Sequence, residues 1–433
     1  MIWSLCPALG LGDGSPDSDG FNLGGHMRRL IGFLALTDLA AVLFLINGLE
    51  VFARLFYVLL LALIVSFLWA KVSLRGIAVE SRLSSSTTQM GQSVEERVSV
   101  YNRNPLPKLW MEVRRVSELP GYTYSRAVSL GGVRSVSWPM TIQARRRGRF
   151  AIGPTTVVSG DPLGLFQRQA TISGVHNLTV YPAVVDLPAF AVPPADLPGE
   201  GRHRRRTHFV TPNASSVREY AYGDSFNRIH WPSTARTGQL MVKEFELDPA
   251  SEVWILLDLH KDVQTGEGLE STEEYGVTVA ASIAKRYLDT NRSIGLMAYG
   301  SSYAILRPDR GGHQRAHIME TLALAEAQGQ VPIQDLIEGE GKRFGRYTTL
   351  VIITPSGDEA WVRSAQYLIR RGAKAAVALI DPTSFNGGEG TLLALSTLVA
   401  SRIPTFLVRK GDNLARALGG GGEDASRIWS TRR

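Results

Sequence analysis

The sequence predicts a multidomain protein with an N-terminal transmembrane helical hairpin, an all-β sandwich domain and a C-terminal α/β domain that has a mainly parallel sheet. Three observations predict this order. Two almost wholly apolar runs lie near the start of the chain, segments that alternate polar and apolar residues follow, and apolar strands separated by helical patterns fill the last part. The 433 residues suffice for two or three domains.

Composition excludes some classes of function. The net charge of +7 is modest for 433 residues, so we expect no nucleic-acid partner. Cys6 is the only cysteine, which excludes an internal disulfide and a metal site built on paired cysteines. The lack of disulfides suits a reducing compartment.

The first segment of the chain, residues 1–26, is rich in Gly, Asp and Ser and is predicted to be a disordered N-terminal extension. Met27 resembles a natural start, because two arginines and then an apolar run follow it. We hypothesise that residues 1–26 are absent from the natural product. N-terminal sequencing tests this, and a peptide that begins before Met27 refutes it.

Residues 27–71 are predicted to form two transmembrane helices, at about 30–47 and 51–70, because each apolar run approaches the ~20 residues that span a bilayer. The short connection between them predicts a hairpin. Small residues that would mark a signal-peptide cleavage site follow neither run.

Charges flanking the hairpin predict its orientation. Arg28 and Arg29 precede the first helix, and Lys71 and Arg75 follow the second. Since positive flanks stay inside, both outer ends are expected in the cytoplasm. The predicted location is therefore the cytoplasmic (inner) membrane, with a multi-pass anchor, the membrane as a partner and the soluble domains facing the cytoplasm.

Residues 72–182 are predicted to form the β-sandwich, because short alternating runs are separated by Pro and Gly turn signals. Residues 71–182 carry 15 Lys and Arg against 6 Asp and Glu. This excess would attract anionic headgroups if the domain lies near the membrane. Solvated outward faces of strands explain the arginines equally well.

Residues 183–250 are predicted to be a linker that contains a dense motif, VREYAYGDSFNRIHWPSTAR, at 217–236. Asp224 could cap a short helix, and Arg228 would stack against it one turn later. Pro232 is expected to end that helix. The motif is interpreted either as an interdomain clasp of ion pairs or as a recognition or active surface.

This motif resembles the hallmark of the domain-of-unknown-function-58 family. The residues that carry the resemblance, and the candidate site, are Arg218, Glu219, Tyr220, Gly223, Asp224, Arg228, Ile229, His230, Trp231, Ala235 and Arg236. A second family-like stretch comprises residues 146–150, Gly153-Pro154 and 161–166. The resemblance implies a membrane-anchored bacterial protein with a von Willebrand factor A-like domain and a MoxR-type AAA+ ATPase as its partner. It implies no known reaction.

Residues 251–411 are predicted to be the α/β domain, von Willebrand A-like by the resemblance, and residues 412–433 a disordered tail. The apolar strand after residue 252 ends at Asp258, and ligands gather at the carboxyl ends of such strands. Von Willebrand A domains commonly carry D-x-S-x-S there. In this chain His260 and Asp262 replace the two serines.

Asp258, His260 and Asp262 are therefore the candidate metal ligands of a degenerate site. Imidazole is a poor Mg²⁺ ligand, whereas carboxylates with imidazole suit Mn²⁺ or Zn²⁺. The alternative is a vestigial loop that binds no metal, and no other cofactor is expected. P-loop, dinucleotide-binding, nucleophile-elbow and H-E-x-x-H motifs are absent from the sequence.

The sequence thus predicts a non-enzymatic, membrane-tethered protein–protein interaction or scaffold module, working with a MoxR-type AAA+ ATPase in the assembly or maturation of other proteins. The alternative is a metal-dependent hydrolase of unknown substrate that uses Asp258, His260 and Asp262. A concave pocket with converging acids would favour the hydrolase.

Overall fold

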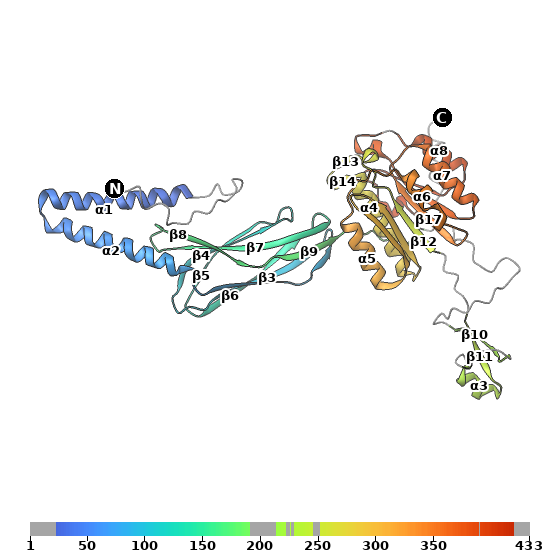
Figure 1. Ribbon diagram of the computed structural model, residues 1–433, viewed down its shortest axis with the longest axis horizontal. Helices are drawn as coiled ribbons and strands as arrows, with labels where there is room; N and C mark the ends of the chain where they lie inside the picture. Colours follow the sequence, from blue (N-terminus) through green and yellow to red (C-terminus); the bar gives the residue numbers. More distant parts are fainter. Residues whose placement is uncertain are drawn as a thin grey trace. The chain divides into compact units, whose positions relative to one another are not determined.

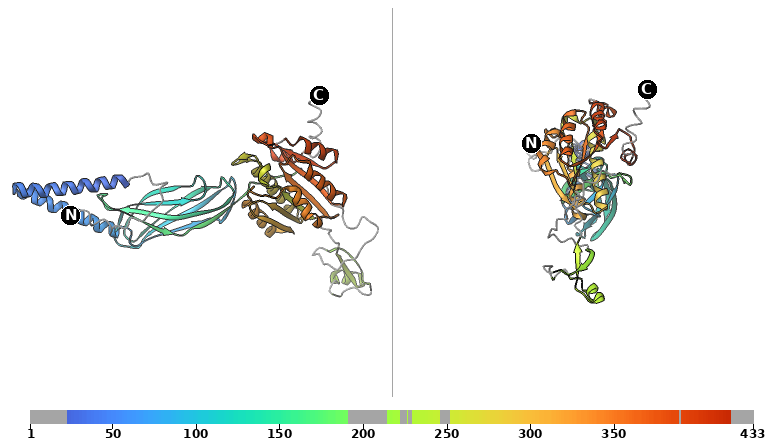
Figure 2. Two further views of the ribbon diagram at one scale, coloured as in Figure 1. Left: turned by 45° about the horizontal axis from the view of Figure 1, so that its top comes forward. Right: turned by 90° about the vertical axis from the view of Figure 1, so that its right-hand side faces the viewer.

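The computed structural model of the protein describes residues 23–190, 214–221, 226, 229–245, 252–388 and 390–419. The described chain forms two compact units. The first takes the chain up to Ser86 with Ser93–Gln143 and Phe150–Leu178; the second takes Thr87–Gln92, Ala144–Arg149 and the chain from Thr179. Figures 1 and 2 show the elements of each unit.

Two apolar helices begin the first unit, as predicted. Helix α1 (Leu23–Asn47) and helix α2 (Glu50–Ser73) are long and apolar enough to cross a membrane. Gly48 adopts a φ of 61° in the turn between them, a conformation that glycine takes without a Cβ clash. Most of their large apolar side chains are exposed to the surroundings. The helices are therefore candidate membrane spans.

The strands between residues 77 and 181 form two β-sheets. One has the order β1-β3-β6, and the other has the order β2-β9-β7-β4-β5, with β8 pairing to β7. The strands are β1 (Ile77–Leu83), β2 (Thr87–Gln89), β3 (Ser93–Asn102), β4 (Lys108–Ser117), β5 (Tyr124–Leu130), β6 (Arg134–Gln143), β7 (Gly148–Gly160), β8 (Gln167–Ser173) and β9 (His176–Tyr181). Alternating residues of β3 are buried, as expected for a strand with one face on a core.

A small apolar core fills the space between these sheets. It contains Val79, Val98, Val100, Met111, Val113, Leu130, Trp138 and Val157. An ion pair is also buried there: Arg115 Nη2 lies 2.8 Å from Glu96 Oε1, and both side chains are completely inaccessible. Because Glu96 is on β3 and Arg115 on β4, the pair joins the two sheets.

The second unit contains a six-stranded sheet of order β16-β15-β12-β17-β18-β19. The strands are β12 (Glu252–Leu257), β15 (Ile294–Tyr299), β16 (Tyr303–Asp309), β17 (Thr348–Thr354), β18 (Lys374–Ile380) and β19 (Thr405–Val408). All neighbours are parallel except β15 and β16. The prediction of a mainly parallel sheet is confirmed, and its strand order is that of a doubly wound α/β fold.

Helices cover both faces of this sheet (Figure 1). One core packs α4 (Thr272–Asp289), α5 (Gly311–Ala323) and the short α9 (Leu414–Ala417) against one face; the other packs α6 (Ile333–Glu340), α7 (Glu359–Arg370) and α8 (Leu392–Ala400) against the opposite face. Residues of β12 alternate between the two cores, with Ile255 in one and Leu256 in the other. Burial on both faces explains the continuous apolar runs in these strands.

Short elements complete the second unit. They are β13 (Gly266–Glu267), β14 (Glu270–Ser271) and the 3₁₀ turns η3 (Lys261–Val263), η4 (Gly341–Arg343) and η5 (Pro382–Phe385). A separate two-stranded sheet pairs β10 (Ala214–Glu219) with β11 (Met241–Phe245), and α3 (Trp231–Thr237) lies between them in the sequence.

Three predicted boundaries are wrong. Residues 23–26 were expected in the disordered extension, but they belong to helix α1, while residues 1–22 lie outside the described chain. Residues 183–190 were expected in the linker, but Leu187 and Phe190 are buried in the core of the α/β unit, and the backbone N–H of Val185 donates to Ser282 Oγ. Residues 412–419 were expected in the disordered tail, but Leu418 is fully buried. Residues 183–190 and 412–419 are held by apolar contacts with the core of the α/β unit, although neither segment has a periodic pattern. Residues 191–213 and 420–433 lie outside the described chain.

Candidate functional site

The candidate metal site lies where the winding of the sheet reverses. Strand β12 has β15 on one side and β17 on the other, so the carboxyl ends of β12 and β17 flank the topological switch point. Asp258 directly follows β12, and Thr354 is the last residue of β17. The structure thus brings these two side chains together from positions 96 residues apart in the chain.

Asp258 is nearly inaccessible, with 4% of its surface exposed. Its Oδ1 accepts the backbone N–H of His260 at 3.0 Å, and its Oδ2 accepts the hydroxyl of Thr354 at 2.6 Å. Burial raises the pKa of Asp258, and the bonds from Thr354 and His260 oppose that rise. The carboxylate is therefore held by two neutral donors, with no ion pair to it within the described residues.

The three predicted metal ligands are not equally placed. The ring Nε2 of His260 lies 3.7 Å from Asp262 Oδ2, and the side chain of Asp262 is 70% exposed. Asp258, in contrast, contacts the backbone of His260. In the described part of the chain, no group of three His, Cys, Asp or Glu residues is arranged to hold a metal. Metal binding by Asp258, His260 and Asp262 stays a prediction.

The family-like motif folds around the β10–β11 pair. Arg218 and Glu219 lie on β10 opposite Val242 and Met241. The ring of Tyr220 stacks on Phe226 with centroids 5.8 Å apart. Gly223, Asp224 and Arg228 lie outside the described residues, so the predicted cap and its stacked arginine are not described.

The second half of the motif forms helix α3, which contradicts the prediction that Pro232 ends a helix. The helix starts at Trp231 and has Pro232 in its first turn, where the missing N–H leaves no intrahelical bond unmade. Ile229 is buried, and His230 Nδ1 lies 2.7 Å from Ser233 Oγ. Trp231, Ala235 and Arg236 are exposed. The interdomain clasp stays a prediction.

Arg147, in the second family-like stretch, has a structural role that the sequence did not reveal. Its side chain is 4% exposed, and Nη2 lies 2.6 Å from Glu273 Oε1 at the start of α4. The guanidinium also donates to the carbonyl of Leu322 in the last turn of α5 at 3.2 Å and to that of Ala325 just after the helix at 2.7 Å, and it pairs with Glu274. Segment 144–149 is thereby fixed within the second unit.

The outer side of helix α8 is an exposed apolar surface that was not predicted from the sequence. Its inward residues Ala394, Leu395 and Leu398 are buried, yet Leu392 and Leu393 on its outer side are each 67% exposed. The helix, LLALSTLVA, has no charged residue. A helix that is apolar all round normally lies within a core or under a partner. We refer to Leu392, Leu393 and Val399 as the α8 surface.

Helix α7 borders the α8 surface with positive charge. Two hydrogen bonds join the helices: Gln366 Nε2 to Ser401 Oγ at 2.7 Å, and Thr397 Oγ1 to Glu359 Oε1 at 3.1 Å. Arg363 and Arg370 are exposed on α7 and form no ion pair with any described residue. The two helices run beside each other in Figure 1. An apolar surface with a basic border suits an acidic partner.

The described residues thus form two apolar N-terminal helices, β-rich regions and a mixed six-stranded sheet. Residues 216–387 match the model of the family described as "Protein of unknown function DUF58". This match covers the motif at 217–236 and much of the α/β unit, and it supports the resemblance drawn from the sequence.

Two bacterial proteins have sequences similar to this chain. The chain is 26% identical over 367 residues to "Uncharacterized protein YeaD" of Bacillus subtilis (strain 168), covering 82% of this chain and 89% of that protein. It is 27% identical over 175 residues to "Uncharacterized protein Rv1480" of Mycobacterium tuberculosis (strain ATCC 25618 / H37Rv), covering 38% of this chain and 54% of that protein. The chain thus spans about half the length of the mycobacterial relative.

Among solved structures, the CARDB domain of the PF1109 protein from Pyrococcus furiosus matches 24% of this chain and 91% of its own, at 15% identity and a TM-score of 0.20. A score this low carries no argument about fold or function.

Proposed function

We propose that this protein is a membrane-tethered interaction or scaffold module that works with a MoxR-type AAA+ ATPase in the assembly or maturation of other proteins. The single observation that carries the proposal is the α8 surface, an apolar helix face that is exposed on the α/β unit. The ATPase as partner comes from the family resemblance.

The α/β unit in this proposal is von Willebrand A-like. Its strand order and its antiparallel edge strand β16 support that assignment. The position of Asp258 at the switch point supports it as well. In the proposed arrangement, α1 and α2 span the cytoplasmic membrane and the soluble parts face the cytoplasm. Protease shaving of intact spheroplasts tests the orientation: cleavage within residues 252–419 before lysis would contradict it.

The proposed docking contact is between the α8 surface and an acidic helix with an apolar side on the partner. Apolar residues would pack on Leu392 and Leu393, and acidic residues would face Arg363 and Arg370. Full burial of a leucine contributes roughly 1.5–3 kcal/mol. Loss of both leucine side chains should therefore weaken the complex by at least about tenfold.

The experiment measures binding of the purified MoxR-type ATPase of the same organism to the full-length protein in detergent, by biolayer interferometry. The double variant Leu392→Ser/Leu393→Ser should bind at least about tenfold more weakly than the wild type. Leu269→Ser is the matched control, because Leu269 is 52% exposed and belongs to the β13–β14 turn, not to α8. Wild-type affinity in the double variant, or an absence of binding by the wild type, contradicts the proposal.

The alternative proposal, a metal-dependent hydrolase at Asp258, His260 and Asp262, has one observation in its favour. Burial raises the pKa of Asp258 at the edge where doubly wound sheets bind ligands. Calorimetric titration of the protein with Mg²⁺, Mn²⁺ and Zn²⁺ tests it, with Asp258→Asn as the control. Heat of binding that the control lacks would favour the alternative, and no heat at millimolar metal would end it.

A further inference from the structure

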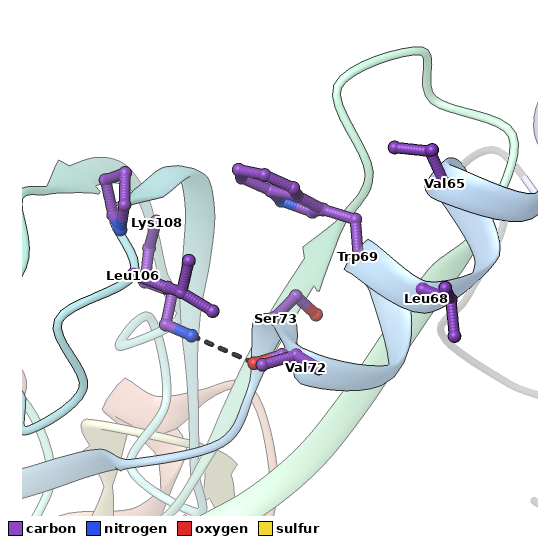
Figure 3. A pocket seen from close by; sticks show the side chains of 8 residues that line it. Val65, Leu68, Trp69, Val72, Ser73, Leu106 and Lys108 are labelled. Carbon is purple, nitrogen blue, oxygen red and sulfur yellow. Dashed lines mark hydrogen bonds between the residues drawn. The ribbon is translucent and has the colours of Figure 1, made fainter. Parts of the chain in front are cut away.

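A cavity lies where helix α2 meets the β-sandwich of the first unit (Figure 3). Its volume is about 230 Å³, and it is lined by Val65, Leu68, Trp69, Val72, Ser73, Leu106, Pro107 and Lys108. Five of these residues belong to the last turns of α2, and the others come from the connection before β4 and from the start of that strand. Its walls are almost wholly apolar.

The one cationic side chain in the lining is buried. Lys108 is 3% exposed, and its Nζ donates to the carbonyl of Val72 at 2.9 Å (Figure 3). An ammonium group has three donors, and no carboxylate pairs with this one within the described residues. Burial lowers the pKa of Lys108, which means that the charged form lacks compensation there. A buried ammonium group with unused N–H donors is stabilised by a bound anion.

The cavity lies at the end of a candidate membrane span. Val65 and Leu68 are half exposed, so the apolar wall continues into the side of α2 that would face lipid. Trp69 and Lys71 lie in the last turns of the helix, and such residues favour the level of the headgroups. With α2 across the membrane, as proposed above, the cavity would open at the level where acyl chains meet the phosphates.

From these observations we infer that the cavity is a binding site for an anionic phospholipid, with part of one acyl chain against Val65, Leu68 and Trp69 and the phosphate beside Lys108. A volume of about 230 Å³ is below the roughly 300–1,000 Å³ that encloses a whole small ligand. The site thus takes a part of the lipid, while the remainder stays in the bilayer. The inference rests on the proposed membrane tether.

The cavity contains its own reporter, since Trp69 forms one wall. The full-length protein is reconstituted into phosphatidylcholine vesicles that contain either brominated phosphatidylglycerol or brominated phosphatidylcholine at the same mole fraction. Bromine quenches tryptophan at short range. Because the chain has 8 tryptophans, the signal of Trp69 is the difference between the wild type and Trp69→Phe. We expect phosphatidylglycerol to associate about fivefold more strongly than phosphatidylcholine, which is the roughly fivefold preference that one basic residue gives for an anionic headgroup.

Two variants separate the site from general charge attraction. Lys108→Met should abolish the preference for phosphatidylglycerol, whereas Lys71→Met, which removes an exposed charge near the same helix end, should leave most of it. Leu106→Phe fills the cavity without changing charge and should lower quenching by both lipids. It keeps the site testable if Lys108→Met fails to fold by circular dichroism.

The outcomes distinguish the site from the tether. Equal quenching by the two lipids in the wild type, or equal losses in Lys71→Met and Lys108→Met, overturns the lipid site. That result would leave Lys108 as a cap for the carbonyls that end α2. Failure of the protein to float with the vesicles at all would instead overturn the tether itself.

Discussion

Two buried carboxylates, one in each unit, are stabilised in opposite ways. Glu96 in the β-sandwich is completely inaccessible and faces the guanidinium of Arg115 at 2.8 Å. The hydroxyl of Tyr122 donates to Glu96 Oε2 at 2.5 Å, and the hydroxyl of Ser81 donates to Oε1, the oxygen that Arg115 faces. Asp258 in the α/β unit is almost as buried, yet one hydroxyl and one backbone N–H are the donors that hold it.

The comparison shows that Glu96 has a structural role, whereas the surroundings of Asp258 are those of a binding site. Arg115 is itself fixed by Thr155 Oγ1 at 2.5 Å and by the carbonyl of Ile152, so the pair with Glu96 is locked on both sides. Asp258 forms no ion pair with a lysine or arginine of the described residues, and burial raises its pKa. A buried carboxylate with a raised pKa at a sheet edge is typical of a binding site.

Breaking the locked pair should have the largest effect. Arg115→Met leaves the charge of Glu96 buried without its cation, and removal of one partner of a buried pair costs about 3–5 kcal/mol. Urea denaturation of the purified full-length protein in detergent, followed by circular dichroism, measures the loss.

The double variant Glu96→Leu/Arg115→Met is the control for this prediction. Replacement of both partners by apolar residues is often close to neutral, so the double variant should recover most of the lost stability. A double variant that is as unstable as Arg115→Met would show that packing, not charge, holds this position.

A smaller effect is expected from Tyr122→Phe, which removes one donor to Glu96 and leaves the ion pair. Loss of a hydrogen bond to a buried charged group costs about 1–3 kcal/mol. Burial and the neighbouring Glu96 raise the pKa of Tyr122, so the hydroxyl stays protonated over the working range of pH. The same denaturation experiment applies. Tyr57→Phe, on the exposed side of α2, should change nothing.

The smallest effect, of opposite sign, is expected at Asp258. Its folded pKa is raised, so its contribution to stability is fully present below the unfolded value of 3.8 and is lost as the pH rises through the folded value. Asp258→Asn keeps an acceptor for the N–H of His260 and removes the charge. It should stabilise the protein at pH 7 by about 1 kcal/mol, with a melting temperature a few degrees higher.

The pH series provides the check on that expectation. Melting temperatures of the wild type should fall relative to those of Asp258→Asn as the pH rises above 3.8. A variant that is less stable than the wild type at every pH would contradict the expectation and show that the bond from Thr354 to the carboxylate outweighs the cost of the buried charge.

The fold could be predicted to the extent that burial leaves a local pattern. Strands β12 and β17 are buried on both faces, and their continuous apolar runs indicated the parallel sheet. Strand β3 is buried on one face, and its alternation indicated a sandwich. Position in the sheet also identified Asp258, because a strand end can be recognised in the sequence.

Contacts across long separations could not be predicted. Arg147 meets Glu273 and the carbonyl of Ala325, which are 126 and 178 residues away, and no spacing rule connects them. Thr354, the side-chain donor to Asp258, is 96 residues away in the chain, and its own strand end has no residue type that predicts this contact. Leu187 and Phe190 were predicted to lie in a linker because prolines near them are typical of linkers, but both side chains are buried. The exposure of Leu392 and Leu393 on α8 could not be predicted either, because an apolar pattern does not distinguish an inner from an outer helix face.

The interleaving of the two units along the chain has a genetic consequence. Segments 87–92 and 144–149 fold with the carboxyl-terminal unit, although strands of the other unit precede and follow each of them. A single cut after residue 178 would therefore leave the carboxyl-terminal product without segments 87–92 and 144–149. A gene fragment beginning after residue 182 would lose Arg147 and leave Glu273 and Glu274 without their cation. The two units would have to be inherited, duplicated or exchanged together.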